Sequence, residues 1–119
     1  NRLVCLFGCG GDRDKTKRPL MAKAAAEYAD KLIITSDNPR NEEPSAIIDD
    51  ILEGLKDSLV SYDIVENRRD AIKHALVTGE KGDIIVLAGK GHEDYQILKG
   101  YEKIHFDERE IVAEILKEI

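Results

Sequence analysis

The residues best suited to chemistry directly follow an apolar run at positions 32–34. Segment 37–40, Asp-Asn-Pro-Arg, brings a carboxylate, a carboxamide and a guanidinium together beside one proline. Pro39 fixes its own φ and favours an extended residue before it, so this loop has a stiff backbone. Arg40 can bind a carboxylate through two parallel hydrogen bonds, which suits a small zwitterionic ligand. The alternative is an Asx turn into a helix, which requires no ligand.

A first loop, residues 8–18, is rich in glycine and charge. It departs from the dinucleotide fingerprint because Arg13 stands where the third glycine belongs. It departs from the phosphate-binding P-loop because Cys9 and Asp14 occupy both glycine positions. Four cations near a predicted helix start remain, and they suit an anion: Arg13, Lys15, Lys17 and Arg18. The alternative is a solvated loop whose charges serve solubility.

The segment 36–43 is the second loop, and a third loop at residues 89–94 follows another apolar run. Two glycines in the third loop allow backbone groups to approach a ligand closely. Glu93 can accept a hydrogen bond from an ammonium group. His92 is a candidate acid or base, although a single loop histidine is more often structural.

The elements that must position these loops alternate between strand and helix. Short apolar runs predict buried strands at 3–7, 31–35 and 83–88, the last being the clearest, with a shorter strand at 62–65. Helices are predicted to begin at Pro19, at Pro44 and near Asn67. Their predicted core-facing residues are Met21, Ala24, Ala25 and Tyr28; Ile47, Ile48, Ile51, Leu52 and Leu55; and Ala71, Ile72, Ala75 and Leu76.

The C-terminal part departs from this alternation. Residues 95–106 predict a β-hairpin, and Asp107 with Glu110 resembles a capping box that starts a last helix, with Ile111, Val112, Ile115 and Leu116 inward. The whole predicts an α/β, Rossmann-like fold: a mostly parallel sheet with helices on both faces and one antiparallel hairpin near the C-terminus. All three loops follow strands, so we expect them to converge at the carboxyl edge of the sheet, where ligands bind.

Composition narrows the possible functions. The 119 residues suffice for one domain, and a formal charge of −6 argues against general nucleic-acid binding. No apolar stretch approaches the ~20 residues of a membrane span. Cys5 and Cys9 are expected to be reduced thiols, as is usual inside cells. A metal-binding domain that uses Cys5, Cys9 and His92 is an alternative, although a zinc site would want more ligands at closer spacing. The chain starts in an apolar run without methionine, so we expect an excised domain of a longer protein.

Five segments, taken in order, resemble a known family. They are residues 8–14, 17–19, 37–40, 43–44 and 88–96, and together they look like the C-terminal domain of the Mur ligases of peptidoglycan synthesis. The Asp-Asn-Pro-Arg version is similar to the members that add meso-diaminopimelate. The resemblance implies that residues 1–119 are the amino-acid-binding, C-terminal domain of a three-domain ligase. Its N-terminal and central ATPase domains are absent from this chain. A lysine-adding ligase and a stand-alone anion- or nucleotide-binding module are alternatives.

The resemblance also implies roles for single residues. Six of them would bind meso-diaminopimelate: Arg13, Asp37, Asn38, Arg40, Gly89 and Glu93. The two arginines would pair with carboxylate oxygens, and Asp37 with Asn38 would complete a polar fork around the distal end. The Gly89 carbonyl and the Glu93 carboxylate would hold the distal ammonium, and Asp12 would meet the nucleotide ribose. Lysine lacks the distal carboxylate and would leave an arginine unpaired, which allows strong discrimination.

The implied reaction is ATP-dependent amide-bond formation. ATP phosphorylates the D-glutamyl γ-carboxylate of UDP-N-acetylmuramoyl-L-alanyl-D-glutamate, and the diaminopimelate amine attacks the acyl phosphate. ATP and Mg²⁺ would be bound mainly by the missing central domain, over which this domain would close. We therefore expect no catalytic residue and no metal ligand in this chain, and an inactive isolated domain. The resemblance places the full enzyme in the bacterial cytoplasm.

Overall fold

The computed structural model describes residues 2–90 and 93–119. The described elements, in chain order, are β1 (Leu3–Phe7), α1 (Lys17–Tyr28), β2 (Lys31–Ile34), α2 (Pro44–Glu53), β3 (Ser61–Ile64), α3 (Arg68–Thr78), β4 (Ile84–Leu87), β5 (Tyr95–Ile97), β6 (Lys103–His105) and α4 (Glu108–Glu118). Pro44 opens α2 as predicted, and Asn67 and Asp107 accept backbone hydrogen bonds at the starts of α3 and α4. Within the described part, no helix has the length and apolar character needed to span a membrane.

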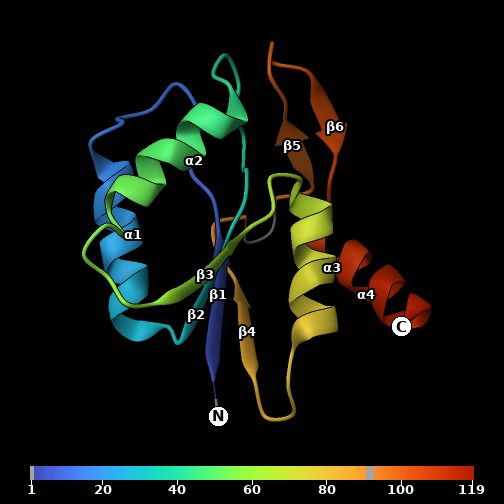
Figure 1. The fold of residues 1–119 in the computed structure, drawn as a ribbon. Coiled ribbons are helices and arrows are strands. Elements are labelled where there is room, and N and C mark those ends of the chain that lie inside the picture. The colour runs from blue at the N-terminus through green and yellow to red at the C-terminus, as the bar shows by residue number, and fades with distance from the viewer. Residues whose placement is uncertain (1, 91–92) are drawn as a thin grey trace.

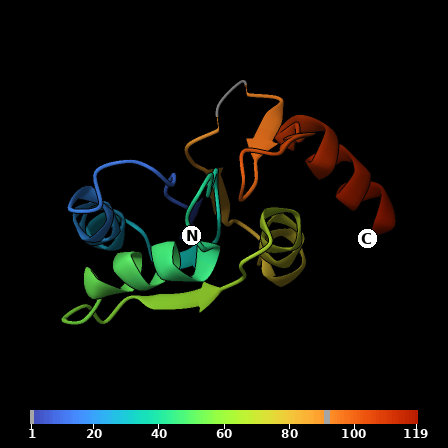
Figure 2. The ribbon, with the colours of Figure 1, turned by 90° about the horizontal axis from the view of Figure 1, so that it is seen from above.

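The main sheet has the strand order β3-β2-β1-β4, and every neighbouring pair is parallel. Strands β5 and β6 form a separate antiparallel pair, in which Tyr95 lies opposite His105. Helices α1 and α2 lie on one side of the sheet, while α3 and α4 lie on the other, as the two views of Figures 1 and 2 agree. The predicted Rossmann-like fold with a C-terminal hairpin is confirmed.

Two apolar clusters fill the spaces on either side of the sheet. One joins β1 and β2 to α1 and α2 through residues such as Phe7, Leu32 and Ile51. The other joins the opposite face of the same strands to α3 and α4 through residues such as Ile33 and Ile115. Strands β1 and β2 contribute to both clusters, which explains why their sequences are continuously apolar rather than alternating.

The predicted core face of α1 is partly wrong. Met21 and Tyr28 are 47% and 75% exposed and Ala24 is also exposed, whereas Ala22 is fully buried. The inward stripe consists of alanines at helical spacing, Ala22, Ala25, Ala26 and Ala29, which pack in the α1/α2 cluster. Small residues suit this helix because it packs closely on α2: a Cβ at Gly54 would lie 2.1 Å from the carbonyl oxygen of Pro19. Leu116 of α4 is also exposed, against prediction.

Strand β4 is not buried on both faces, as its apolar sequence predicted. Ile84 and Val86 are 60% and 42% exposed, while Ile85 and Leu87 pack on the α3/α4 cluster. The reason is the position of β4 at the end of the strand order, next to β1 alone. A strand at the edge of a sheet can lack cover on one face even when its sequence is entirely apolar.

Candidate functional site

The described parts of the three loops meet beyond the carboxyl ends of β1, β2 and β4. The first and second loops are joined by a hydrogen bond of 2.7 Å from the Gly11 amide to the Asn38 carbonyl. The second and third loops are joined by the Lys90 ammonium, which donates to the Asn38 side-chain oxygen at 3.1 Å. The predicted convergence of segments far apart in sequence is therefore confirmed.

Two glycines of the first loop are required by this close approach. A Cβ built at Gly8 would lie 2.4 Å from the Thr35 carbonyl oxygen, and one at Gly11 would lie 1.8 Å from the Pro39 carbonyl oxygen. Both distances are far below van der Waals contact with backbone atoms that cannot easily move. These glycines let the first loop lie against the second, so the glycine-rich sequence reflects packing between the loops.

A pocket of about 490 Å³ lies between the first loop, the start of α1 and the neighbouring loops. Arg13, Asp37 and Gly89, three of the six residues predicted to bind an amino acid, line it. Gly89 adopts a φ of +104°, a conformation that side-chain-bearing residues rarely adopt. Asp14, Lys17 and Arg18 also line the pocket, which therefore combines cationic and carboxylate side chains with an exposed stretch of backbone.

The other predicted binding residues do not line this pocket. Arg40, at a φ of 55°, donates from Nη1 to the carbonyl oxygens of Gly11 at 3.0 Å and Asn38 at 3.3 Å. Among residues 2–90 and 93–119, no hydrogen bond or ion pair of its Nη2 is seen. Asn38 is buried, and its Oδ1 accepts bonds from the Ile97 amide at 2.8 Å as well as from Lys90. Asn38 therefore acts within the protein, linking the second loop to β5.

Lys90 is absent from the predicted site residues, yet it connects three of them. Its side chain is 0% exposed, and Nζ lies 2.9 Å from Asp37 Oδ1 and 3.5 Å from Glu93 Oε1, beside the bond to Asn38. The rings of Tyr95 and Phe106 lie about 6 Å from Nζ. The sequence contained a signal for this arrangement. Lys90 is a long cation between two glycines after a strand, so it can fold back toward the sheet, and an acidic residue follows three positions later. We call Lys90, Asp37, Asn38 and Glu93 the Lys90 cluster.

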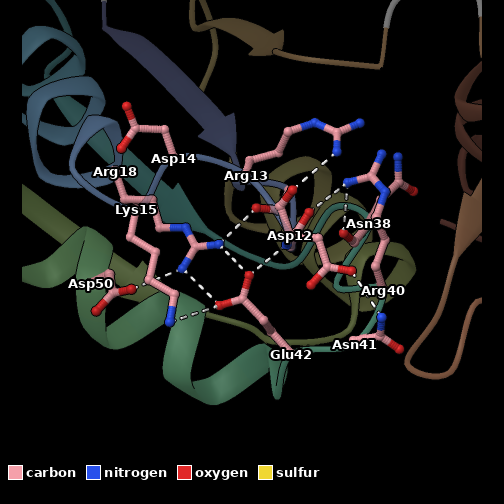
Figure 3. A network of polar contacts seen from close by, with 12 residues as sticks. Asp12, Arg13, Asp14, Lys15, Arg18, Asn38, Arg40, Asn41, Glu42 and Asp50 are labelled. Carbon is pink, nitrogen blue, oxygen red and sulfur yellow. Dashed lines mark hydrogen bonds and ion pairs between the residues drawn. The ribbon is translucent and has the colours of Figure 1, made fainter.

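A second buried cation, Arg18, organises the first loop (Figure 3). It donates to both carboxylate oxygens of Glu42 at 3.1 and 2.8 Å, to Asp50 at 2.8 Å and to the Gly10 carbonyl at 2.9 Å. The Arg18 guanidinium lowers the pKa of Glu42 to about 2. We call these four residues the Arg18 cluster. Both Nη atoms of Arg18 are therefore engaged within the protein, while its buried Nε has no hydrogen-bond partner among the described residues. This corrects its place among the four predicted cations of the first loop.

Asp12 is also engaged within the protein. Its amide donates to Glu42 at 2.6 Å, and its Oδ2 accepts bonds from the Asn41 side chain at 3.1 Å and from the Tyr101 hydroxyl. Tyr101 belongs to the turn between β5 and β6, so Asp12 connects the first loop to the second loop and to the hairpin. Among the described residues, Oδ1 is the side-chain oxygen of Asp12 that remains for the predicted contact with a ribose. That contact stays a prediction.

Cys5, Cys9 and His92 were candidates for a metal site, and His92 was also a candidate acid or base. Burial raises the pKa of Cys5, and it raises the pKa of Cys9 to about 11, so both thiols stay protonated near neutral pH. His92 and Gly91 lie outside the described residues. Elsewhere in the chain, the structure brings together no group of three or more histidine, cysteine or acidic side chains that could hold a metal ion.

Comparison with known proteins gives a consistent result. Residues 1–91 match the family model described as Mur ligase, glutamate ligase domain. A protein of Clostridium acetobutylicum named UDP-N-acetylmuramoyl-L-alanyl-D-glutamate–2,6-diaminopimelate ligase 1 is 58% identical over 118 residues, which cover 99% of this chain and 24% of that protein. A Trichormus variabilis protein named as the same kind of ligase is 56% identical over 117 residues, covering 98% of this chain and 23% of the relative.

A solved structure agrees with these sequence relatives. The structure titled as a UDP-N-acetylmuramoyl-L-alanyl-D-glutamate–2,6-diaminopimelate ligase superposes with a TM-score of 0.94 at 44% sequence identity. The match covers 99% of this chain and 24% of that structure. The chain therefore spans about a quarter of the length of the proteins that it matches.

Proposed function

Since this chain belongs to the Mur ligase family, we propose that it serves as the C-terminal domain of a ligase that adds meso-diaminopimelate to UDP-N-acetylmuramoyl-L-alanyl-D-glutamate. The names of the relatives support this substrate, and the extent of each match supports a much longer whole protein. N-terminal and central ATPase domains would precede residues 1–119. A lysine-adding ligase has no such support among the relatives described above.

The observation that carries the proposal is the pocket lined by Arg13, Asp37 and Gly89. The distal end of diaminopimelate bears one carboxylate and one ammonium, and the pocket lining offers side chains of both charges, among them Arg13 and Asp37. Arg13 would pair with the carboxylate through charge-assisted hydrogen bonds. Asp37 and the Gly89 carbonyl would accept from the ammonium.

The remaining predicted residues would act around this pocket. Arg40 uses Nη1 within the protein, and the rest of its guanidinium would pair with a ligand carboxylate. The Glu93 carboxylate would add a third acceptor for the ammonium, beside Asp37 and the Gly89 carbonyl. Asn38, whose side-chain oxygen is already shared by Lys90 and Ile97, would hold the second loop in place rather than contact the ligand.

ATP and Mg²⁺ would act in the full enzyme, supplying the phosphoryl group that activates the D-glutamyl carboxylate. The exposed Lys15 and Lys17 of the first loop fit a phosphate, and Asp12 would contact the ribose through its free oxygen. Mg²⁺ would be held mainly by the central domain. That domain, ATP, the UDP-linked dipeptide and diaminopimelate would be the partners, in the bacterial cytoplasm.

The test uses the full-length protein that contains this chain. We expect it to ligate meso-diaminopimelate in preference to lysine, and we expect Arg40→Ala to lose about 2–4 kcal/mol of transition-state binding, mainly as a higher KM for diaminopimelate. Initial rates at varied amino-acid concentration measure this. Arg69→Ala is the control, because Arg69 lies on α3 and pairs with Glu114. An unchanged KM in Arg40→Ala, or a preference for lysine in the wild type, would contradict the proposal.

A further inference from the structure

The Lys90 cluster places a positive charge of the protein where a positive charge of the ligand is expected. Lys90 Nζ contacts Asp37 and Glu93, the two carboxylates proposed to receive the diaminopimelate ammonium. Lys90 itself does not line the pocket, whereas its neighbour Gly89 and its partner Asp37 do. The ammonium of Lys90 therefore lies behind the pocket wall and acts on a ligand through those two carboxylates.

The contacts of Lys90 leave these carboxylates able to bind more. Asp37 Oδ1 and Glu93 Oε1 are buried atoms, yet within the described residues neither accepts an aligned hydrogen bond. The 2.9 Å contact between Asp37 and Lys90 is an ion pair without hydrogen-bond alignment, and the 3.5 Å contact to Glu93 is looser. Among residues 2–90 and 93–119, Asn38 alone accepts an aligned bond from Nζ, at 3.1 Å. Lys90 therefore attracts both carboxylates electrostatically without using all of their capacity to accept hydrogen bonds.

We propose that Lys90 is a positioning residue that determines specificity: its buried ammonium offsets one of the two carboxylates, so that the pocket favours an ammonium accompanied by a carboxylate over an ammonium alone. This inference rests on the proposed function. Two cations that share one carboxylate lie roughly 4–6 Å apart, close enough to repel each other strongly in a partly buried site. For diaminopimelate, the attraction of Lys90 for the distal carboxylate offsets that repulsion. For lysine, nothing offsets it.

The experiment compares two amino acids in the full-length enzyme. The measured quantity is the ratio of kcat/KM for meso-diaminopimelate to kcat/KM for L-lysine, in the wild type and in Lys90→Met, which keeps the length of the side chain and removes its charge. We expect this ratio to fall at least about tenfold, because the repulsion that acts on lysine alone is lost. If Lys90 only supported the fold, both substrates would lose activity together and the ratio would stay the same.

Three further variants separate charge from shape. Lys90→Arg keeps the charge, so its ratio should stay within about threefold of the wild type even if its activity falls. Lys90→Met combined with Asp37→Asn restores the net charge of the cluster, so the selectivity ratio of this double variant should return toward the wild-type value. The double variant also tests the inference if Lys90→Met alone does not fold. Lys103→Met is the matched control, since Lys103 is exposed and lies over the Tyr95 ring at 4.3 Å.

The outcomes distinguish this inference from the proposed function. A wild-type enzyme that prefers lysine would overturn both. A wild-type enzyme that prefers diaminopimelate, with the same ratio in Lys90→Met, would overturn only the role of Lys90. A double variant that lost selectivity at least tenfold would also overturn it, because its net charge equals that of the wild type.

Discussion

Two buried cations, Arg18 and Lys90, lie beside the same second loop and have different kinds of contact. Each faces two carboxylates and one further oxygen. Within the described part of the chain, the planar guanidinium of Arg18 makes four aligned hydrogen bonds, two of them to one carboxylate, whereas the ammonium of Lys90 makes one. The geometry of the donors explains the difference, because an arginine fork matches a carboxylate and an ammonium is a point charge.

This difference separates two functions for buried charge. The oxygens of Glu42 are occupied by Arg18 and by the Asp12 amide, so the Arg18 cluster stabilises the first loop and has little capacity for a ligand. In the Lys90 cluster, Asp37 lines the pocket, and within the described residues both Asp37 and Glu93 keep a buried oxygen without a hydrogen bond. We therefore expect mutations in the Arg18 cluster to change stability and mutations at Lys90 to change selectivity.

The largest stability effect is expected from Arg18→Met. This change leaves Glu42 and Asp50 without their shared cation and removes the bond to the Gly10 carbonyl, so the free energy of unfolding should fall by about 3 kcal/mol. Urea unfolding of the purified chain measures it. Lys17→Met, one position earlier on the exposed side of α1, should change stability by less than about 0.5 kcal/mol. Equal effects of the two variants would remove the distinction between the clusters.

A smaller loss is expected from Asn38→Ala. The buried Asn38 oxygen accepts bonds from Lys90 and from the Ile97 amide, and the substitution leaves both donors without it, at a cost of about 2 kcal/mol. The matched control is Asn41→Ala, since Asn41 is exposed and its side chain contacts Asp12 at the surface. Thermal unfolding of the two variants should differ clearly, and a loss at Asn41 as large as that at Asn38 would argue against the linking role of Asn38.

The smallest effect concerns acid stability. The pKa of Glu42 is about 2 in the folded chain against a usual value of 4.5, so its ion pair contributes stability above about pH 4.5 that is lost as pH falls toward 2. Glu42→Gln should lower stability by about 1 kcal/mol at pH 7 and by much less near pH 2. Asp83 and Asp107, whose pKa values are also lowered to about 2, are retained in both proteins. A difference between wild type and Glu42→Gln that did not vary with pH would contradict this role of the ion pair.

The sequence predicted the fold correctly where the local pattern and the tertiary environment agree. The core stripe of Ile47, Ile48 and Ile51 and the start of a helix near Asn67 were both predicted correctly. The apolar residues of β4 did not reveal that it is an edge strand, because strand order depends on connections that no local pattern encodes. The bulky residues of α1 pointed to the wrong face, because close packing on α2 selects the alanines.

The sequence predicted only part of the site, because the rest depends on contacts between segments that are distant in sequence. The convergence of the three loops follows from the prediction that each loop follows a strand of a parallel sheet. Arg13, Asp37 and Gly89 line one pocket there, and their binding to an amino acid stays a prediction. The burial of Arg18 and Lys90 was not predicted, because a charged residue is normally exposed unless partners from distant segments surround it. Glu42 lies 24 residues from Arg18, and Asn38 lies 52 residues from Lys90, distances at which sequence spacing has no predictive value.

The most direct test of the amino-acid site is a crystal structure of the full-length protein with meso-diaminopimelate. We expect the distal carboxylate of the ligand beside Arg13 and its distal ammonium within hydrogen-bond distance of Asp37 or of the Gly89 carbonyl. Lys90 should remain behind these groups, in contact with Asp37. Diaminopimelate bound away from this pocket, with Arg13 and Asp37 both free of ligand, would contradict the account.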